Sequence, residues 1–525
     1  MDQAGQMSFG GAPGERADRL LAELGYADWR PGQREAVIAA LEGRDSLIVM
    51  PTGGGKSLCY QLPGLASDDL TIVVSPLIAL MRDQWLRLTA AGHPVTMISS
   101  GMDEGDAWAA LEDVRSGEAR IVYCAPERFG SKAFLEALAQ RRIDLIAVDE
   151  AHCVSEWGHD FRPDYLRLPQ IADRLGRPTV MACTATATKP VAAEIASRFG
   201  MREPLQVRAG FDRPNLSFDV VPLEGTGSKA RRQALLEAGL ADPANRPAIV
   251  YCGTRKDTDE VAATLREVGL EAHPYHAGMD SEARTAVQRR FMSGETEVIV
   301  ATNAFGMGVD KANVRSVWHM TIPTSVEAYY QEAGRAGRDG LPARAVLLAM
   351  KMDLGRLVRF NEQRAGDPAM EIAHERGWRA YRAIKEFIYS ERCRRRSLLD
   401  HFGDRLTGAP LERCCDVCDP QSWLPDPETI AVRRPQKSGS AAPAPDLSAA
   451  DAPLFEALKA WRLATAAGKP AYTVANNRTL AAIAAIRPAD PGALIEISGV
   501  GPSFIAKYAP EVLAIIADHQ TLAAA

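Results

Sequence analysis

The stretch "MPTGGGKSLCYQ" (residues 50–61) follows the apolar run "DSLIVM" (45–50) and opens a helical pattern. Glycines let backbone N–H groups curl around phosphates, and a helix N-terminus adds partial positive charge. The stretch departs from the GxxxxGK[ST] pattern because Met50 stands where that pattern has its first glycine. It therefore favours nucleotide binding, with a chance glycine-rich turn as the alternative.

Apolar β-rich runs alternate with helical stretches on both sides of this turn, up to about residue 345. One series ends at "TVMACTATA" (179–187), and a second runs from "AIVYCGT" (248–254) to "VRSVWHM" (314–320). Continuous apolar strands separated by helices are typical of parallel sheets covered on both faces. The sequence therefore predicts an α/β fold with two parallel-sheet domains, divided near "GFDRPNL" (210–216).

The rest of the chain indicates helical modules joined by a linker. Residues 370–400 carry an apolar helical stripe, residues 435–453 are rich in Pro, Ala and Ser, and the C-terminal residues favour a small all-α bundle. The predicted parts are a disordered tail (1–18), two α/β domains (19–208 and 209–345), a helical cysteine-containing module (346–420), a flexible linker (421–450) and the bundle (451–525).

The chain has 525 residues, a net charge of −6 and nine cysteines. This charge argues against a surface coated in positive potential, but one local nucleic-acid groove is compatible with it. No apolar run approaches the ~20 residues of a membrane span, and the N-terminus shows no signal-peptide pattern. We therefore expect a cytoplasmic protein without membrane contact. Five scattered cysteines are expected to be buried packing residues: Cys59, Cys124, Cys153, Cys183 and Cys252.

Two adjacent carboxylates end the apolar strand in "LIAVDEAH" (145–152). Lys56 is expected to reach the β- and γ-phosphates of ATP, while the Ser57 hydroxyl and Asp149 hold Mg²⁺. Glu150 is expected to orient and activate the attacking water. Two solvated acids are the alternative, but after a phosphate-binding loop the pair favours ATP hydrolysis. The loop residues predicted to bind ATP are Thr52, Gly53, Gly54, Gly55, Lys56 and Ser57.

The stretch "YYQEAGRAGRDG" (329–340) lies in the second α/β domain. Its Arg335 and Arg338 are three residues apart and are expected to share one helical face. An arginine supplied across a domain cleft neutralises charge that develops on the γ-phosphate, which contributes ~10³–10⁵ in rate. A surface charge pair is the alternative. A site divided between two domains couples ATP binding to closure of the cleft, as a molecular motor requires.

Six stretches resemble, in order, the helicase motifs of superfamily 2. They are "TGGGKS" (52–57), "SPLIALMRDQ" (75–84), "DEAH" (149–152), "TATAT" (184–188), "VATNAFGMGVDKANVR" (300–315) and "QEAGRAGRDG" (331–340). More narrowly, the chain is similar to the RecQ family of DNA helicases between about residues 20 and 345. The resemblance implies two RecA-like motor domains.

That family implies an ATP- and Mg²⁺-dependent 3′–5′ helicase that tracks on single-stranded DNA and unwinds duplex or branched DNA. It also implies roles in repair and recombination, a single-strand-binding protein as a candidate partner, and association with the nucleoid in a bacterium. Loops at 75–77, 126–128, 253–256, 275–280 and 301–303 are implied to contact DNA phosphates. An RNA helicase and an ATP-driven remodelling factor with little processive unwinding stay open as alternatives.

The stretch "LGYADWRPGQREAV" (24–37) resembles the adenine-recognition element of RecQ proteins. The resemblance implies that Tyr26 stacks on the base, while Arg30 and Gln33 contact adenine. An aromatic face offers stacking, and a Gln amide can both donate to and accept from the adenine edge. Without the family, Tyr26 is more simply a half-buried surface aromatic.

The stretch "CVSEWGHDFRPDY" (153–165) combines aromatic and basic residues, which suits stacking on single-stranded bases. It resembles the aromatic-rich loop through which RecQ proteins couple DNA binding to ATP hydrolysis. Without that resemblance, Trp157 and Phe161 read more simply as a pair that packs in the core. The coupling residues implied by the resemblance are His152, Trp157, His159, Phe161, Arg162 and Gln331.

Three cysteines gather in "ERCCDVCDP" (412–420), and "SERCRRRSLLDHFGD" (390–404) resembles the RecQ zinc-binding helix. The predicted ligands form a Cys₄ set, which suits a structural Zn²⁺ site: Cys393, Cys414, Cys415 and Cys418. Glu412 stands where the commonest family spacing has a cysteine. A three-cysteine site completed by another ligand, or unliganded thiols, are the alternatives. "RCRRR" (392–396) either helps to hold phosphate or forms a solvated helix end.

The family usually continues after the zinc ligands with a winged-helix domain of about a hundred residues. Here a short stretch rich in Pro, Ala and Ser leads to the terminal bundle, so we expect that domain to be absent and unwinding to be weaker. The bundle resembles an HRDC domain, a module that binds DNA in some proteins and protein in others. Its "ISGVGPS" turn, with Lys507 nearby, either presents backbone N–H groups to phosphate or only caps a helix.

Overall fold

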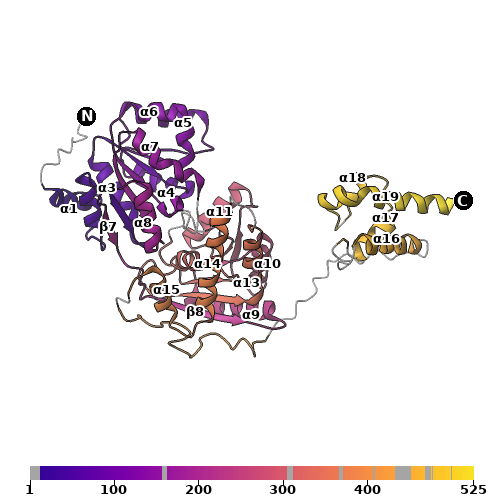
Figure 1. The fold of residues 1–525 in the computed structure, drawn as a ribbon. Helices are drawn as coiled ribbons and strands as arrows, with labels where there is room; N and C mark the ends of the chain where they lie inside the picture. The colour runs from indigo at the N-terminus through magenta and orange to yellow at the C-terminus, as the bar shows by residue number, and fades with distance from the viewer. Residues whose placement is uncertain are drawn as a thin grey trace. The chain divides into compact units, whose positions relative to one another are not determined.

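The computed structural model describes residues 12–51, 53–155, 162–303, 305, 311–365, 370–405, 408–431, 451–466, 474–475, 477–497 and 499–524. The chain divides into two compact units, Met1–Val432 and Arg433–Ala525. The first contains two sheets and the cysteine-containing module, and the described residues of the second form helices (Figure 1).

The first sheet has seven parallel strands in the order β3-β4-β2-β5-β6-β1-β7, with helices on both faces (Figure 1). Leu47 and Val49 of β1 join one hydrophobic cluster and Ile48 joins another, because successive side chains of a strand point to opposite faces. The strands are β1 (Ser46–Val49), β2 (Leu70–Val74), β3 (Val95–Ile98), β4 (Ile121–Cys124), β5 (Ile143–Val148), β6 (Thr179–Thr184) and β7 (Leu205–Arg208). The helices are α1 (Pro13–Glu23), α2 (Gln33–Leu41), α3 (Lys56–Ala66), α4 (Ile78–Ala90), α5 (Glu104–Ser116), α6 (Lys132–Leu138), α7 (Leu168–Arg174) and α8 (Lys189–Arg198).

The second sheet has six parallel strands in the order β10-β11-β9-β12-β13-β8. Its strands are β8 (Leu216–Leu223), β9 (Ala248–Tyr251), β10 (Ala272–Tyr275), β11 (Val298–Ala301), β12 (Ser316–His319) and β13 (Ala343–Met350). Its helices are α9 (Ser228–Ala241), α10 (Arg255–Glu267), α11 (Ser281–Ser293) and α12 (Val326–Ala333). The predicted α/β fold with two parallel sheets is therefore confirmed, while the predicted domain boundaries stay a prediction.

The ligand-binding edge of both sheets follows from their topology. In open parallel sheets, ligands bind beyond the carboxyl ends of the strands. The phosphate-binding loop follows β1, and the acidic pair follows β5. The loops implied to contact nucleic acid follow β2 and β4 in the first sheet, and β9, β10 and β11 in the second. The parallel arrangement thus places each of these loops at the functional edge of its own sheet.

A helical module packs on the second sheet and completes the first unit. It comprises α13 (Lys351–Glu362), α14 (Glu371–Tyr389) and α15 (Arg394–Phe402), followed by the cysteine-rich segment. Phe387 of α14 lies 5.1 Å from the ring of Tyr329 in α12. The backbone of Cys415 forms an isolated parallel β-bridge with Phe218 of β8, which is an edge strand of the second sheet. The module thus covers an edge that would otherwise be open to pairing.

The second unit is built around its own apolar core, as the sequence predicts for the terminal bundle. Its helices are α16 (Ala452–Thr465), α17 (Asn477–Ile486), α18 (Pro491–Ile495) and α19 (Pro502–Ala524). Leu454, Leu480 and Ile483 are fully buried in that core. Gly499 has φ = 96°, and an ideal Cβ there would lie 2.1 Å from Thr479 Oγ1. The glycine therefore permits the tight turn before α19.

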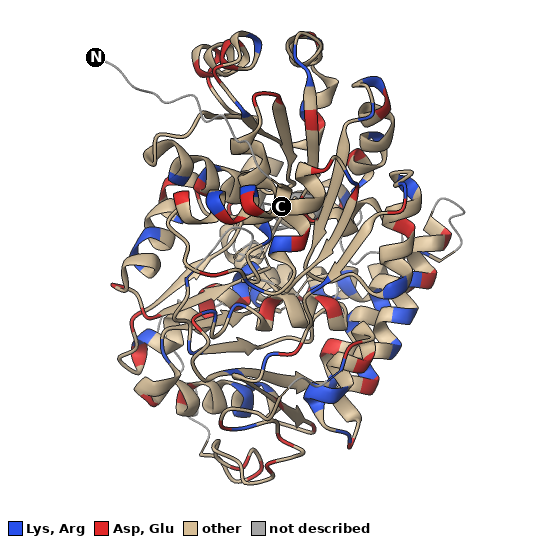
Figure 2. Cartoon of the chain, turned by 90° about the vertical axis from the view of Figure 1, so that its left-hand side faces the viewer, with Lys and Arg blue, Asp and Glu red and all other residues tan. Residues whose placement is uncertain are grey.

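Lys and Arg positions alternate with Asp and Glu positions along the helices coloured in Figure 2, in keeping with the net charge of −6. Among the helices that the structure describes, none has the length and apolar character needed to cross a bilayer.

Candidate ATP site, zinc centre and nucleic-acid surface

The phosphate-binding loop joins β1 to α3, which begins at Lys56. Gly53 and Gly55 have φ values of 82° and 81°, a region that residues with a Cβ rarely adopt. A Cβ on Gly54 would lie 3.0 Å from the carbonyl oxygen of Pro51. The Lys56 ammonium donates to the carbonyl oxygens of Met50 at 3.0 Å and Pro51 at 3.4 Å. The loop thus curls around the lysine, as a phosphate cradle requires; Thr52 lies outside the described residues.

The predicted adenine element is tied directly to this loop. Gln33 is 2% exposed, and its Nε2 donates to the carbonyl oxygen of Gly55 at 3.0 Å. Its Oε1 accepts from the backbone N–H of Arg30 at 2.8 Å, and the Arg30 guanidinium contacts the carbonyl of Gly53. Tyr26 is 54% exposed. Gln33 and Arg30 therefore brace the loop from the backbone side, while the Tyr26 ring is available for stacking.

The acidic pair lies at the end of β5. Asp149 is 4% exposed, and burial together with the neighbouring Glu150 carboxylate raises its pKa to about 7, while Lys56 opposes that rise. Glu150 has φ = 48°, an uncommon conformation for a residue with a side chain, and one that clusters at functional sites. Its Oε2 is buried, and within the described part of the chain it accepts no hydrogen bond.

The oxygen donors at this edge fit a Mg²⁺ ion. Mg²⁺ binds carboxylate and hydroxyl oxygens and usually keeps waters and substrate phosphates in its shell. Asp149 supplies a buried carboxylate, and Ser57 supplies a hydroxyl that accepts from Gln84 Nε2 at 3.1 Å. A cation would favour ionised Asp149, which burial alone disfavours. The chemistry of the donor set thus matches the predicted metal.

His152 connects the acidic pair to the neighbouring strand β6. Its Nδ1 lies 3.0 Å from Thr184 Oγ1 and 3.4 Å from Glu150 Oε2. Thr184 begins the "TATAT" stretch, and its hydroxyl also accepts from the backbone of Thr186 at 3.3 Å. Two motifs that are separate in sequence, DEAH and TATAT, are therefore linked through His152.

The aromatic loop is only partly described. Trp157, His159 and Phe161 lie outside the described residues, so their coupling role stays a prediction. Arg162, at the end of that loop, donates from its backbone to Cys153 O at 3.0 Å and from Nη1 to Pro76 O at 3.4 Å. The loop is thus anchored to residues 75–77, one of the segments implied to contact DNA.

The predicted placement of the two arginines is wrong in one respect. Helix α12 ends at Ala333, so Arg335 and Arg338 lie in the turn that follows it and share no helical face. Gly337, with φ = 56°, reverses the chain between them. We call the α/β parts built on the first and second sheets the first and second lobes. Arg338 of the second lobe reaches the first lobe, because an ideal Cβ on Gly53 would lie 3.5 Å from Arg338 Cγ. Arg335 is instead 8% exposed and lies near Tyr251. Gln331 lies half-buried in the last turn of α12.

Two residues that the sequence does not single out hold this turn in place. Arg213 donates to the carbonyl oxygens of Ala336 at 3.0 Å and Gly337 at 2.9 Å. Asn215 Nδ2 also donates to Gly337 O, at 2.7 Å. Both belong to "GFDRPNL", which the sequence marks only as a domain divider. No local pattern reveals their role, because their partners lie more than a hundred residues away.

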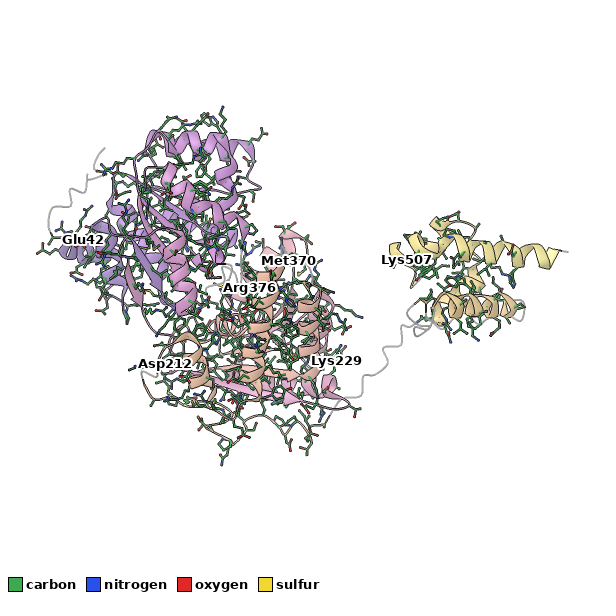
Figure 3. The ribbon with its side chains drawn as sticks, in the orientation of Figure 1. Glu42, Asp212, Lys229, Met370, Arg376 and Lys507 are labelled. Atoms are coloured by element: carbon green, nitrogen blue, oxygen red, sulfur yellow. The ribbon has the colours of Figure 1, made fainter. Side chains whose placement is uncertain are left out.

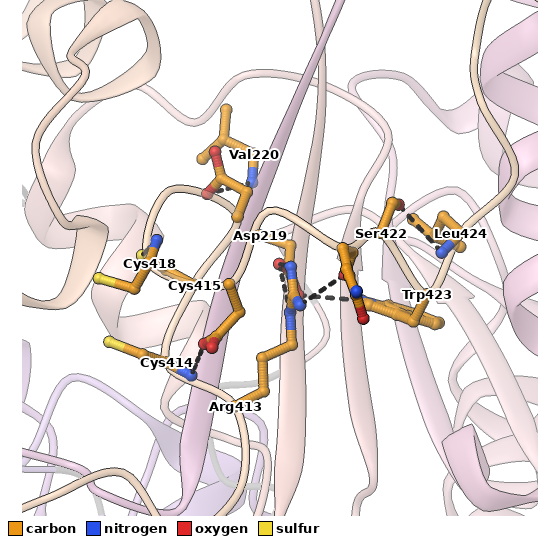
Figure 4. Close-up of polar contacts among 12 residues, drawn as sticks. Asp219, Val220, Arg413, Cys414, Cys415, Cys418, Ser422, Trp423 and Leu424 are labelled. Atoms are coloured by element: carbon orange, nitrogen blue, oxygen red, sulfur yellow. Dashed lines mark hydrogen bonds and ion pairs between the residues drawn. The ribbon is translucent and has the colours of Figure 1, made fainter.

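The four predicted zinc ligands come together in the structure. Their sulfur atoms all lie within 4.8 Å of one another, and Cys393 Sγ lies 3.6 Å from Cys414 Sγ. A tetrahedral site with Zn–S bonds of about 2.3 Å requires sulfur separations of about 3.8 Å. Asp419 accepts from the backbone N–H of Cys414 at 2.8 Å and fixes the ligand loop (Figure 4). The cluster of Cys393, Cys414, Cys415 and Cys418 therefore fits a closed zinc site.

The centre of the basic run beside Cys393 is buried and ion-paired, so it is not the solvated helix end given as one alternative, while a phosphate contact by the run stays a prediction. Arg394 forms a bidentate pair with Asp416, and Arg395 forms one with Asp212, at 2.6 and 2.7 Å. Arg395 and Asp212 are 3% and 1% exposed, respectively. Asp212, labelled in Figure 3, lies before β8 in the segment between the sheets. Both arginines thus fasten the zinc module together and onto the second lobe.

Four known family models match successive parts of the chain, in the order of the two sheets, the zinc module and the terminal bundle. The models "DEAD/DEAH box helicase", "Helicase conserved C-terminal domain", "RecQ zinc-binding" and "HRDC domain" match residues 30–195, 216–340, 351–419 and 451–516. The ATP-dependent DNA helicase RecQ of Pasteurella multocida is 38% identical over 401 residues, which cover 76% of this chain and 62% of that protein. The chain belongs to the RecQ helicase family.

Other RecQ relatives show the same extent of similarity. The ATP-dependent DNA helicase RecQ of Bacillus subtilis is 38% identical over 74% of this chain and 65% of its own length. The probable ATP-dependent DNA helicase RecS of the same organism is 40% identical over 63% of this chain and 66% of its own length. The chain thus spans somewhat less than two thirds of the length of these relatives.

Solved structures support the two-lobed fold. The helicase MrfA bound to DNA and AMPPNP aligns with a TM-score of 0.54 at 22% identity, over 66% of this chain and 52% of that one. The DEAD-box helicase Mss116 bound to ssRNA and UDP-BeF gives a TM-score of 0.54 at 19% identity, over 74% of this chain and 88% of that one. At these identities the likeness concerns the fold alone.

Proposed function

We propose that this RecQ chain is an ATP-dependent DNA helicase that tracks 3′–5′ on single-stranded DNA and unwinds duplex or branched DNA in repair and recombination. The observation that carries the proposal is the position of Arg338 in the second lobe against Gly53 of the phosphate-binding loop. An ATP site completed by the second lobe makes the separation of the lobes depend on the nucleotide. The names of the RecQ relatives supply the substrate class.

The roles of the site residues follow from their positions. Lys56 would bind the β- and γ-phosphates, and Ser57 and Asp149 would hold Mg²⁺, which when bound offsets phosphate charge. Glu150 would take the proton of the attacking water, whose oxygen forms the new bond to the γ-phosphorus while ADP leaves. Arg338 would stabilise the charge that develops on the γ-phosphoryl oxygens. Arg335, which is buried near Tyr251, would position the turn that carries Arg338.

The nucleic-acid surface would run along the carboxyl edges of both sheets. Contacts there would be mainly to phosphates, because a motor that moves along a strand must accept any base. His152 would couple a change in the contacts of Glu150 to Thr184 at the end of β6. Arg162 would join the aromatic loop to residues 75–77. Forked DNA is the expected substrate, and a single-strand-binding protein is a candidate partner. The HRDC-like unit would add a second contact with DNA or protein.

The test is ATP hydrolysis by purified protein with no nucleic acid, with oligo(dT) or with oligo(rU), followed by strand displacement on forked, blunt and tailed duplexes of both tail polarities. We expect stimulation by DNA well above that by RNA, and displacement only of duplexes with a 3′ tail. Equal or greater stimulation by RNA would contradict the DNA assignment. Displacement that requires a 5′ tail would contradict the polarity.

A DNA remodelling factor with little processive unwinding is the second candidate function. The zinc-binding match ends at residue 419 and the HRDC match begins at 451, which leaves 31 residues between them. That length is too short for a winged-helix domain of about a hundred residues, in keeping with its expected absence. If displacement stops within a few base pairs while a mobile branch point is still moved, this second function is favoured.

A further inference from the structure

An arginine of the zinc module reaches the functional edge of the second sheet. Strands β9 and β12 are neighbours, with Tyr251 paired to His319. Gly253 and Thr321 follow these strands at their carboxyl ends. Arg356, on α13, donates from Nη2 to Thr321 Oγ1 at 2.7 Å and to Ile322 O at 3.4 Å. A helix outside both sheets therefore contributes a cation to the edge where ligands bind in parallel α/β folds.

The Arg356 guanidinium lies directly on the backbone of the loop at 253–256. An ideal Cβ on Gly253 would be 2.2 Å from Arg356 Nη1 and 3.3 Å from its Cζ. A side chain at position 253 would thus displace the guanidinium, so the glycine permits this close approach. The loop at 253–256 is one of those that the family resemblance implies to contact DNA phosphates, whereas Arg356 belongs to none of them.

The Arg356 guanidinium keeps hydrogen-bond donors and charge available for a ligand. Within the described residues, the acceptors Thr321 Oγ1 and Ile322 O both bond to Nη2, and the buried Nε has no hydrogen-bond partner. Asp353, one helical turn earlier, is paired with Arg232 at 3.2 Å; burial raises the pKa of its carboxyl, and both Arg232 and Arg356 oppose that rise. No carboxylate in the described part of the chain forms an ion pair with Arg356. The Arg356 side chain is half-buried, so a strand passing over the edge could reach it.

Two further positive groups lie at the same edge. Helix α10 begins at Arg255, within the stretch 253–256, and its N-terminus carries partial positive charge. Arg255 also lies against Gly278 in the loop at 275–280, with 3.1 Å between its Cδ and an ideal Cβ there. The combination of a helix N-terminus, a glycine that exposes backbone and two guanidinium groups is suited to a phosphodiester.

We propose that Arg356 is a phosphate-binding residue for the strand on which the protein tracks, so that the zinc module takes part directly in gripping DNA. This inference rests on the proposed helicase function. The zinc module then has two tasks: its cysteines hold the fold, and its first helix supplies a contact to the moving strand. Loss of zinc would accordingly weaken strand binding through α13 as well as destabilise the module.

The experiment measures the dissociation constant for fluorescent oligo(dT) by anisotropy across a series of NaCl concentrations. The variants are Arg356→Gln, Arg356→Lys and the matched control Arg359→Ala, an exposed arginine one turn further along α13. We expect Arg356→Gln to bind about three- to tenfold more weakly and to lower the slope of log Kd against log salt by about 0.7, the value for one phosphate contact on single-stranded DNA. Arg356→Lys keeps the salt slope, and Arg359→Ala matches wild type.

The salt slope separates this role from that of a strut between α13 and the loop, because loss of a strut lowers the melting temperature and leaves the salt slope unchanged. Arg356→Gln with an unchanged salt slope overturns the proposal, whether or not its melting temperature falls. An equal loss in Arg359→Ala overturns it too, because the effect would then be one of general charge. Wild-type protein that fails to bind oligo(dT) at any salt overturns the helicase proposal as well. If wild-type protein binds oligo(dT) and Arg356→Gln has the same dissociation constant and salt slope, only the assignment of Arg356 is overturned.

Discussion

Arg338 of the second lobe lies over Gly53 of the phosphate-binding loop, with Cγ 3.5 Å and Cδ 3.7 Å from the position of an ideal Cβ on that glycine. The two residues are 285 positions apart in the chain. These distances are ordinary van der Waals contacts, and glycine is favoured at position 53 by its φ of 82°. This contact brings the Arg338 side chain to the phosphate-binding loop, where we propose that it meets the γ-phosphate, and gives the first prediction.

Arg338→Ala should lower the kcat of DNA-stimulated ATP hydrolysis by about 10³-fold, because an arginine that offsets transition-state charge acts mainly on the chemical step. Affinity for a non-hydrolysable ATP analogue should change far less. Steady-state kinetics and nucleotide titration measure the two quantities. Arg289→Ala, an exposed arginine on α11, is the control and should behave as wild type. A kcat within threefold of wild type in Arg338→Ala would refute the role.

Asp149 should make the metal-free protein less stable as pH rises. Its pKa is raised to about 7 by burial and by Glu150, against about 3.9 in an unfolded chain. Folding therefore favours the protonated carboxyl, and this contribution to the free energy of unfolding is full below pH 4 and is lost as pH rises to about 7. In buffer without Mg²⁺, Asp149→Asn should melt above wild type at pH 8, with the difference vanishing near pH 4.

Thermal melting between pH 4 and pH 8 checks this expectation. Asp164→Asn is the control, since Asp164 is exposed nearby and its substitution should leave the pH profile of wild type. Adding Mg²⁺ should narrow the gap between Asp149→Asn and wild type, because the cation favours the ionised carboxylate. An identical pH profile for Asp149→Asn and wild type would show that Asp149 is not the titrating group.

Wild-type protein should contain about one zinc per chain, and Cys415→Ser should contain almost none. Cys415 is fully buried and pairs with Phe218 of β8, so the loss should also unfold the module and lower the melting temperature by more than about 5 °C. Elemental analysis and melting measure these effects. Cys252→Ser, at a buried cysteine remote from the cluster, should keep the metal. Well-folded wild-type protein without metal would defeat the zinc assignment.

Removing Arg395 should destabilise the junction between the zinc module and the second lobe. Its partner Asp212 is 1% exposed, and breaking a buried ion pair by removing one partner costs about 3–5 kcal/mol. Urea unfolding of Arg395→Met should show that loss, and adding Asp212→Asn should recover part of it because the charge of the other partner is then removed as well. The adjacent Arg396→Ala is exposed and should stay within about 0.5 kcal/mol of wild type. A cost below about 1 kcal/mol for Arg395→Met would contradict this account.

The parts of the site that were predictable lie within short stretches of sequence. Lys56 and its glycines, the Asp149–Glu150 pair and three of the zinc cysteines each occupy one turn or one strand end, where residue type and spacing indicate the chemistry. The helix expected to carry Arg335 and Arg338 was not found, because Gly334 and Gly337 lie in the same stretch and the chain turns after Ala333. Spacing alone could not distinguish that turn from a helix.

By itself, the sequence determined the two parallel sheets, the order of the modules and the positions of the glycine-rich turn and the acidic pair. These properties are local, since alternating apolar runs and glycine turns act on their immediate neighbours. Only the tertiary structure decided that Arg338 rather than Arg335 meets Gly53, that Arg213 and Asn215 hold their turn, and that Arg356 joins the loop at 253–256. Each of these contacts joins residues from distant elements. Their distances depend on how whole lobes and helices pack, and no pattern along the chain records that packing.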